Sequence, residues 1–292
     1  MTRKEWLNQA QKRLESSGSS TSRLDAEVLL AHVLEVERIH LHMYPEQKVE
    51  PDDLETVETL IRRREKGEPV AYLTGTQEFM GLNFFVSPAA LIPRPETELL
   101  VETVLAELKD RHCLALDREI LAADIGSGSG CIAVSLAVLM PRLKILAVDL
   151  SEEALQNTRK NIRRQGVSNQ VVPLRGDLLE PVEAWLEGTG KLDALISNPP
   201  YISDHEMAEL PASVADYEPP AALAGGVDGL DFYRTITAGA PALLRSGGLL
   251  AFEVGYQQGD AVTRLLEEQG FVEIRLLKDL AGLARVVLGK MP

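Results

Sequence analysis

In this chain the run Asp124-Ile125-Gly126-Ser127-Gly128-Ser129-Gly130 follows a predicted strand, Glu119–Ala123, and precedes a predicted buried helix, Cys131–Ala137. Glycines in such a strand–turn–helix unit let the backbone approach a cofactor where side chains would clash. A dinucleotide-binding fingerprint in this spacing would also require glycine at position 131, but that residue is Cys131. The spacing therefore argues against NAD and FAD as ligands.

Acidic residues mark the ends of the first three predicted strands. Asp124 begins the glycine-rich loop, where a carboxylate would repel a pyrophosphate and attract an ammonium group. The strands Lys144–Asp149 and Val171–Gly176 lead to Asp149, which can accept both hydroxyls of a ribose, and to Asp177, which can accept from an adenine amine. Each acid alone is more often a helix cap. In this order along one sheet edge, they predict a site for a sulfonium amino acid joined to adenosine.

The fourth predicted strand, Leu192–Ile196, leads into Ser197-Asn198-Pro199-Pro200-Tyr201. Because proline has no N–H, the carbonyl of Asn198 or Pro199 is free of a strand ladder and can face a ligand. The Asn198 side-chain oxygen supplies a second acceptor, and the Tyr201 ring supplies a stacking surface. Two acceptors suit a flat –NH2 group, such as an amide or an exocyclic base amine. Pro-Pro alone also marks ordinary turns, but the upstream loop favours the ligand-binding interpretation.

Together these residues resemble the S-adenosylmethionine-dependent class I methyltransferases. They resemble specifically the protein-(glutamine-N5) methyltransferases of the HemK/PrmC type, which modify peptide chain release factors. The resemblance covers nearly the whole chain. Further matching segments are Pro69–Gly75, Glu78–Leu82, Leu91–Leu100, Glu218-Pro219, Ala222-Leu223, Gly229-Leu230, Tyr233-Arg234, Asp279–Gly282 and Arg285–Val287.

The resemblance implies an α/β fold with a Rossmann-like, mostly parallel seven-stranded sheet, an antiparallel last strand and a small N-terminal helical bundle. Alternating strands and helices from Glu119 onward independently predict a mostly parallel sheet. We expect a helical bundle for partner recognition over 1–82, a hairpin linker over 83–94 and a catalytic domain over 95–292. The long loop Ile202–Gly229 is a candidate substrate lid, and Leu283–Leu288 a candidate antiparallel edge strand.

Apolar residues at helical spacing predict the bundle. Trp6, Leu7, Ala10 and Leu14 form one stripe, Ser22 can cap a second helix, and Pro51 can begin a third. Such stripes usually form a core rather than a cofactor site. The cluster Arg62–Arg64 is interpreted as a solvated helix end.

The resemblance also implies the ligands. S-adenosylmethionine is the expected cofactor and S-adenosylhomocysteine its product. Asn198, Pro199 and Tyr201 are the implied catalytic residues, and Pro200, Arg94 and Glu218 join them in substrate binding. Leu178 stands where an aromatic residue often covers the adenine in related proteins, and no general base is identified. The implied cofactor-binding residues are Asp124, Gly126, Ser127, Gly128, Ser129, Gly130, Asp149, Leu150, Asp177, Leu178 and Asn198.

Composition bears on partners and location. The chain has 292 residues, 45% of them hydrophobic, and a net charge of −14. That charge disfavours direct nucleic-acid binding, which relies on phosphate contacts, and favours a protein partner. The expected partner is a class 1 release factor with a Gly-Gly-Gln motif. With no leader segment and no apolar run of about eighteen residues, we expect a cytoplasmic protein away from membranes. We also expect a monomer. Neither Cys113 with Cys131 nor His40 with His42 predicts a metal site, and the two cysteines need not pair.

The predicted reaction is direct methyl transfer from the sulfonium to a glutamine side-chain amide nitrogen. The same acceptors would hold an adenine N6 or guanine N2 amine, so a nucleic-acid amino methyltransferase is the alternative. A non-catalytic adapter is disfavoured by the presence of Asn198–Tyr201, Asp124 and Asp149 together. An oxidoreductase is disfavoured by the missing third glycine.

Overall fold

The computed structural model describes residues 1–112, 119–187 and 190–292. Cys113 therefore lies outside the described residues. The backbone packs as two compact units. One contains Met1–Thr76 together with the short segment Pro211–Tyr217, and the other contains Gln77–Leu210 and Glu218–Pro292. We call them the helical unit and the sheet unit.

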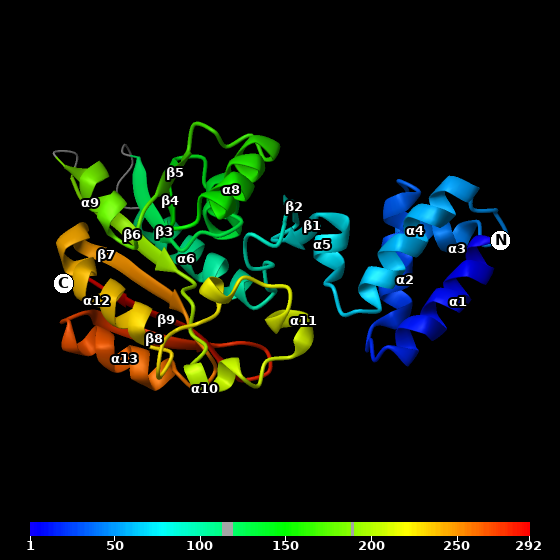
Figure 1. Ribbon diagram of the computed structural model, residues 1–292. Coiled ribbons are helices and arrows are strands. Elements are labelled where there is room, and N and C mark those ends of the chain that lie inside the picture. The colour runs from blue at the N-terminus through cyan, green and yellow to red at the C-terminus, as the bar shows by residue number, and fades with distance from the viewer. Residues whose placement is uncertain (113–118, 188–189) are drawn as a thin grey trace. The chain divides into compact units, whose positions relative to one another are not determined.

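The helical unit is built around the apolar stripes that the sequence predicts. Trp6, Leu7, Ala10 and Leu14 are all buried in its core. Thr2 begins the first helix with a capping box to Glu5, whereas Ser22 is the first residue of its helix and not the predicted cap. The helices of this unit are α1 (Arg3–Ser16), α2 (Ser22–Val33), α3 (Arg38–Met43), α4 (Pro51–Arg64), α5 (Val70–Thr74) and α11 (Ala212–Ala215) (Figure 1).

The sheet unit contains the predicted seven-stranded, mostly parallel sheet. Its strand order is β5-β4-β3-β6-β7-β9-β8, and the first five of these strands run parallel. The predicted antiparallel strand is confirmed as β9, but it lies between β7 and β8 and is not an edge strand. The strands are β3 (Ile120–Ile125), β4 (Leu143–Asp149), β5 (Val171–Arg175), β6 (Leu192–Ser197), β7 (Leu244–Glu253), β8 (Val272–Lys278) and β9 (Ala284–Lys290).

Helices cover both faces of this sheet (Figure 1). Alternate strand residues point to opposite faces, so Ala122 joins one core and its neighbour Ala123 joins the other. On the first face pack α6 (Thr97–His112), α7 (Cys131–Leu139) and α8 (Glu152–Arg164). On the second face pack α9 (Glu180–Leu186), α12 (Asp231–Leu243) and α13 (Gly259–Glu268). The long loop after β6 also carries α10 (Asp204–Met207) and η1 (Pro220–Ala222).

The hairpin lies earlier than predicted. Its strands are β1 (Thr76–Phe79) and β2 (Leu82–Phe85), so only the end of β2 falls within the hairpin linker expected over 83–94. The turn between them is Met80-Gly81, with φ of 53° and 72°. Positive φ at both turn residues matches the twist of a tight hairpin. Methionine is not a typical residue for that conformation, which explains why the turn was missed.

No helix among the described residues is both long and apolar enough to cross a membrane.

The third glycine of the loop provides a test of how the loop packs. A Cβ at Gly130, where φ is 79°, would lie 2.9 Å from Thr158 Cγ2 and 3.3 Å from Thr158 Cα. We expect Gly130→Ala to lower the free energy of unfolding by about 2–4 kcal/mol, because overpacking adds to left-handed strain. Gly126→Ala is the control, since a Cβ there meets nothing within 4 Å, and strain alone should cost about 1–2 kcal/mol. Urea unfolding without cofactor measures both, and equal losses would contradict the packing.

Candidate active site

The predicted ligand residues follow neighbouring parallel strands. Asp124 lies in β3, Asp149 ends β4, and Asn198 directly follows β6. Because β4, β3 and β6 are adjacent and parallel, these three residues share the carboxyl edge of the sheet. The structure thus brings together the central residues of the sequence-predicted site.

The glycine-rich loop is held by backbone contacts and by α8. The backbone N–H groups of Gly126 and Ser127 both donate to Val148 O, at 2.9 and 2.8 Å. Two α8 side chains brace the loop: Thr158 Oγ1 donates to Gly128 O at 2.9 Å, and Asn161 Nδ2 donates to Ser129 O at 2.9 Å. These two hydrogen bonds were not predicted from the sequence, because an Asn and a Thr on an amphipathic helix look like ordinary surface residues.

Asp124 is a fully buried carboxylate that no described side chain pairs. Burial raises the pKa of its carboxyl to about 7, the backbone N–H of Ala133 opposes the rise, and the nearby Asp149 carboxylate adds to it. A buried acid of this kind destabilises the folded protein until a cation or donor pairs with it. An ammonium group bound at this loop would provide that partner.

Asp149 is already oriented by the backbone. Its two carboxylate oxygens accept from Gly128 N at 2.8 Å and from Ser151 N at 2.9 Å. Burial nevertheless raises the pKa of this carboxyl above its usual range. Each carboxylate oxygen has a further lone pair, so the held group can still accept ribose hydroxyls.

The residues predicted to surround an adenine differ in exposure. The Leu150 side chain is 65% exposed and therefore available to cover a flat ring. Asp177 is exposed beyond the end of β5. Leu178 has a φ of 44° and packs partly against the second core, which leaves only part of its side chain for a ligand.

The Asn198–Tyr201 segment is fixed on several sides. Asn198 Nδ2 donates to Thr97 Oγ1 at 3.3 Å, and Gln258 Nε2 donates to Tyr201 O at 2.9 Å. A Cβ at Gly225 would lie 2.8 Å from Pro200 O, and one at Gly229 would lie 2.3 Å from Tyr201 O. Only glycine allows the returning loop to approach this segment so closely.

The two other predicted substrate-binding residues form an ion pair. Arg94 Nη2 lies 2.5 Å from Glu218 Oε1. Glu218 is buried, and its second oxygen has no partner among the described residues, whereas Arg94 is partly exposed. The pair connects the segment before α6 with the loop that follows Tyr201.

Sequence reasoning missed one more acid at this edge. Glu253 ends β7, is only 2% exposed, and carries an unpartnered Oε2. Burial raises the pKa of its carboxyl to about 7. The apolar run around Glu253 is typical of a buried strand, and nothing in its pattern indicates that this acid lies next to Asn198.

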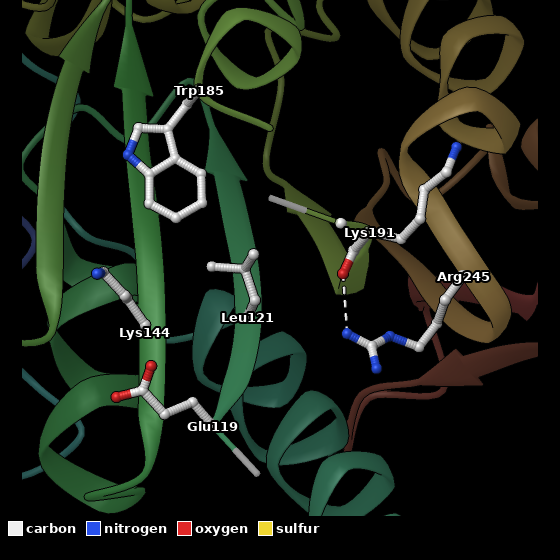
Figure 2. A pocket seen from close by; sticks show the side chains of 7 residues that line it. Glu119, Leu121, Lys144, Trp185, Lys191 and Arg245 are labelled. Carbon is white, nitrogen blue, oxygen red and sulfur yellow. Dashed lines mark hydrogen bonds between the residues drawn. The ribbon is translucent and has the colours of Figure 1, made fainter. Parts of the chain in front are cut away.

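A cavity of about 500 Å³ lies at the opposite, amino edge of the sheet. Figure 2 shows Lys144 and Trp185 on one side and Lys191 and Arg245 on the other, with Arg245 Nη2 donating to Lys191 O at 2.8 Å. None of the predicted site residues lines this cavity.

Comparisons with known proteins identify the family. Residues 5–75 match the family model described as the PrmC N-terminal domain, and residues 96–213 match the methyltransferase small domain. A release factor glutamine methyltransferase from Moorella thermoacetica is 43% identical, over 99% of this chain and 98% of its own. One from Koribacter versatilis is 40% identical, over 100% of this chain and 99% of its own.

The chain belongs to the release factor glutamine methyltransferase family.

A solved structure adds a likeness of fold. The T. thermophilus 16S rRNA N2 G1207 methyltransferase, in complex with AdoMet and guanosine, matches with a TM-score of 0.50 and 18% identity, over 74% of this chain and 50% of its own. Membership of the release factor glutamine methyltransferase family confirms the family resemblance and the class I methyltransferase fold. The roles of individual residues remain predictions.

The burial of Asp124 makes a pH-dependent prediction for stability. Its folded pKa of about 7 lies above the ordinary value, so between about pH 4 and 7 the folded chain binds a proton that the unfolded chain does not. The ligand-free protein should therefore lose stability as the pH rises through this window. Glu253, whose folded pKa is also about 7, contributes to the same slope, so Asp124→Asn should reduce the slope without abolishing it and raise Tm at pH 8 by about 2–4 °C. Asp216→Asn, at an exposed acid, is the control. An unchanged slope in Asp124→Asn would contradict the assignment.

Asp124→Asn should also weaken the binding of S-adenosylmethionine. Removing one partner of a buried ion pair costs about 3–5 kcal/mol, which corresponds to a loss of more than about 100-fold in affinity. Calorimetric titration at pH 8 measures this loss. An affinity within a few-fold of the unmodified protein would show that the ammonium group binds elsewhere.

Proposed function

We propose that this chain transfers a methyl group from S-adenosylmethionine to the side-chain amide nitrogen of the glutamine in the Gly-Gly-Gln motif of a peptide chain release factor. The observation that carries this proposal is the pairing of β3 with β6. Asp124 is in register with Ile196, two residues before Asn198. A cation site and an amide-binding site are thus neighbours at one edge of the sheet.

The residues present fit S-adenosylmethionine, because the unpartnered Asp124 carboxylate calls for a cation and the glycine-rich loop leaves room for close approach. We assign the ammonium group to Asp124, the ribose hydroxyls to Asp149, and the adenine to Leu150, Asp177 and Leu178. One wall of this cofactor site is formed by the backbone of the loop residues Gly126, Ser127, Gly128, Ser129 and Gly130. When bound, S-adenosylmethionine supplies an electrophilic methyl group.

Asn198 and Pro199 bind the acceptor amide in this proposal. An amide nitrogen is a poor nucleophile because its lone pair is delocalised into the carbonyl. The Asn198 side-chain oxygen and a backbone carbonyl of Asn198 or Pro199 accept both N–H groups, which stabilises the positive charge that develops on nitrogen as the methyl–sulfur bond breaks. One N–H proton then leaves to water, which gives the neutral methylated amide. Each bond contributes about 0.5–1.5 kcal/mol, or about 1.5–3 kcal/mol when charge-assisted. These bonds cannot supply the rate enhancement alone, so alignment of the acceptor nitrogen must contribute strongly.

Tyr201 and the Arg94–Glu218 pair complete the substrate side. The Tyr201 ring is the stacking surface for the flat amide, and Pro200 fixes the backbone before it. Burial raises the pKa of the Tyr201 hydroxyl to about 12, so this residue stays neutral at physiological pH. Arg94 and the free oxygen of Glu218 can bind the peptide that flanks the glutamine.

The partner proposal includes the helical unit, to which we assign recognition of the release factor. We propose that the chain acts as a monomer in the cytoplasm and does not bind nucleic acid directly. The net charge of −14 supports a protein partner over a polyphosphate one.

Methyl transfer to a recombinant release factor tests the substrate. We expect label from S-adenosylmethionine to appear on the intact release factor, with the mass of one methyl group on the glutamine. A release factor with Gln→Ala in the Gly-Gly-Gln motif is the control, together with DNA and ribosomal RNA samples. Label on nucleic acid instead would establish the alternative amino methyltransferase activity.

Asn198→Ala tests the acceptor site. Loss of one charge-stabilising acceptor should lower kcat by about 100–1000-fold while the Kd for S-adenosylmethionine changes less than about threefold. Asn83→Ala, at an exposed strand residue, is the control and should behave like the unmodified protein. Equal losses in turnover and cofactor affinity would count against the assigned role.

A further inference from the structure

Glu253 is a buried acid that the mechanism above does not use. It ends β7, and β7 pairs in parallel with β6 in a register that aligns Ser197 with Phe252. Asn198 and Glu253 each follow one of these aligned residues. The two side chains therefore leave adjacent strands at the same level of the carboxyl edge.

Thr97 connects the two side chains. It is the first residue of α6, is 2% exposed, and accepts a hydrogen bond from Asn198 Nδ2 at 3.3 Å. A hydroxyl that accepts a hydrogen bond keeps its own proton to donate. Thr97 and Asn198 are also the hydrogen-bonding side chains that lower the pKa of the Glu253 carboxyl and so favour its charged form. The Glu253 carboxylate thus lies beside both the Thr97 hydroxyl and the Asn198 amide, which are themselves joined by a hydrogen bond.

This chain of contacts distinguishes the two ends of the Asn198 amide. An ionised carboxylate can only accept hydrogen bonds, so it orients the Thr97 hydroxyl towards itself and leaves an oxygen lone pair for an N–H. The –NH2 end of Asn198 therefore faces Thr97, and its oxygen faces away. A reversed amide would present N–H groups to the N–H groups of a bound glutamine and would repel it.

The burial of Glu253 is difficult to explain by stability. Its Oε2 has no hydrogen-bond partner among the described residues, and an unpaired buried carboxylate destabilises a fold. Other charges near it have opposing effects: Arg285 on β9 lowers the pKa of Glu253, and Glu96 before α6 raises it. Tyr201, Tyr233 and Cys131 are the other titratable groups affected by this carboxylate, and each has a raised pKa.

We propose that Glu253 is a positioning residue for methyl transfer, which acts on the Asn198 amide both directly and through Thr97 to hold the Asn198 side-chain oxygen towards the acceptor nitrogen. The inference rests on the proposed function for its kinetic consequence. Its structural consequence, a fixed Asn198 amide, is independent of the substrate.

Two isosteric variants test the kinetic consequence. Glu253→Gln, whose amide can also donate, should lower kcat by at least about 10-fold while the Kd for S-adenosylmethionine stays within about threefold. Thr97→Val keeps the volume but removes the hydroxyl, and should give a similar loss. Thr97→Ser should restore most of the activity. Glu268→Gln, at an exposed acid on α13, is the matched control.

The pH dependence distinguishes positioning from a structural role. Because the folded pKa of Glu253 is about 7, kcat of the unmodified protein should fall as the pH drops through 7, whereas the Glu253→Gln profile should lack this step. The same raised pKa means that the charged carboxylate costs stability at pH 8, so Glu253→Gln should have a higher Tm there. Lower activity together with a higher Tm is the expected result. A lower Tm and weaker cofactor binding together would overturn the proposal, as would a kcat within twofold of the unmodified protein.

A direct readout separates this inference from the substrate assignment. The side-chain –NH2 resonance of Asn198, assigned by its loss in Asn198→Ala, should shift between pH 6 and 8 in the unmodified protein and stay fixed in Glu253→Gln. If the Asn198 resonance changes neither with pH nor on the Glu253→Gln substitution, the inference is overturned even if the release factor is methylated. If the release factor is not methylated but the resonance titrates as expected, only the proposed function fails.

Discussion

Unpaired carboxylates buried at one edge of a parallel sheet are the constraint on which this site depends. Water is excluded from Asp124 and Glu253, and no described side chain neutralises Asp124. Burying these charges lowers the stability of the fold, and apolar packing on the two faces of the sheet offsets that loss. The central strands are almost completely buried there. These unpaired charges raise the free energy of the ligand-free folded protein. A cationic ligand bound at this edge, where ligands of such folds bind, lowers it again.

Much of the fold was predictable because local signals mark each strand end. The loop after β3, the acid that ends β4, the acid after β5 and the prolines after β6 all follow buried apolar runs, and all four strands lie close to their predicted positions, although β3 extends to include Asp124. The errors occurred where tertiary contacts override local signals. Met80 adopts a left-handed turn whose N–H donates to Glu98 at 2.7 Å, and the position of β9 inside the sheet depends on pairing with both β7 and β8.

Site residues that belong to a local sequence motif could be predicted. Those that reach the site only through the register of neighbouring strands could not. Asp124, Asp149 and Asn198 each stand in a recognisable local pattern. Glu253 does not, because its neighbour Asn198 is far away in sequence and comes close only through the pairing of β6 with β7. Thr97 looks like the first residue of a helix. Its contact with Asn198 requires α6 to begin beside the sheet edge.

The loop after β6 makes the two units less separable than the sequence suggests. Its segment Pro211–Tyr217 belongs to the helical unit, where Tyr217 Oη donates to Lys66 O at 3.0 Å, while its flanks belong to the sheet unit. The polypeptide therefore passes between the units three times, and the helical unit is discontinuous in sequence. A cut of the chain after Thr76 would therefore separate the helical unit from its own Pro211–Tyr217 segment.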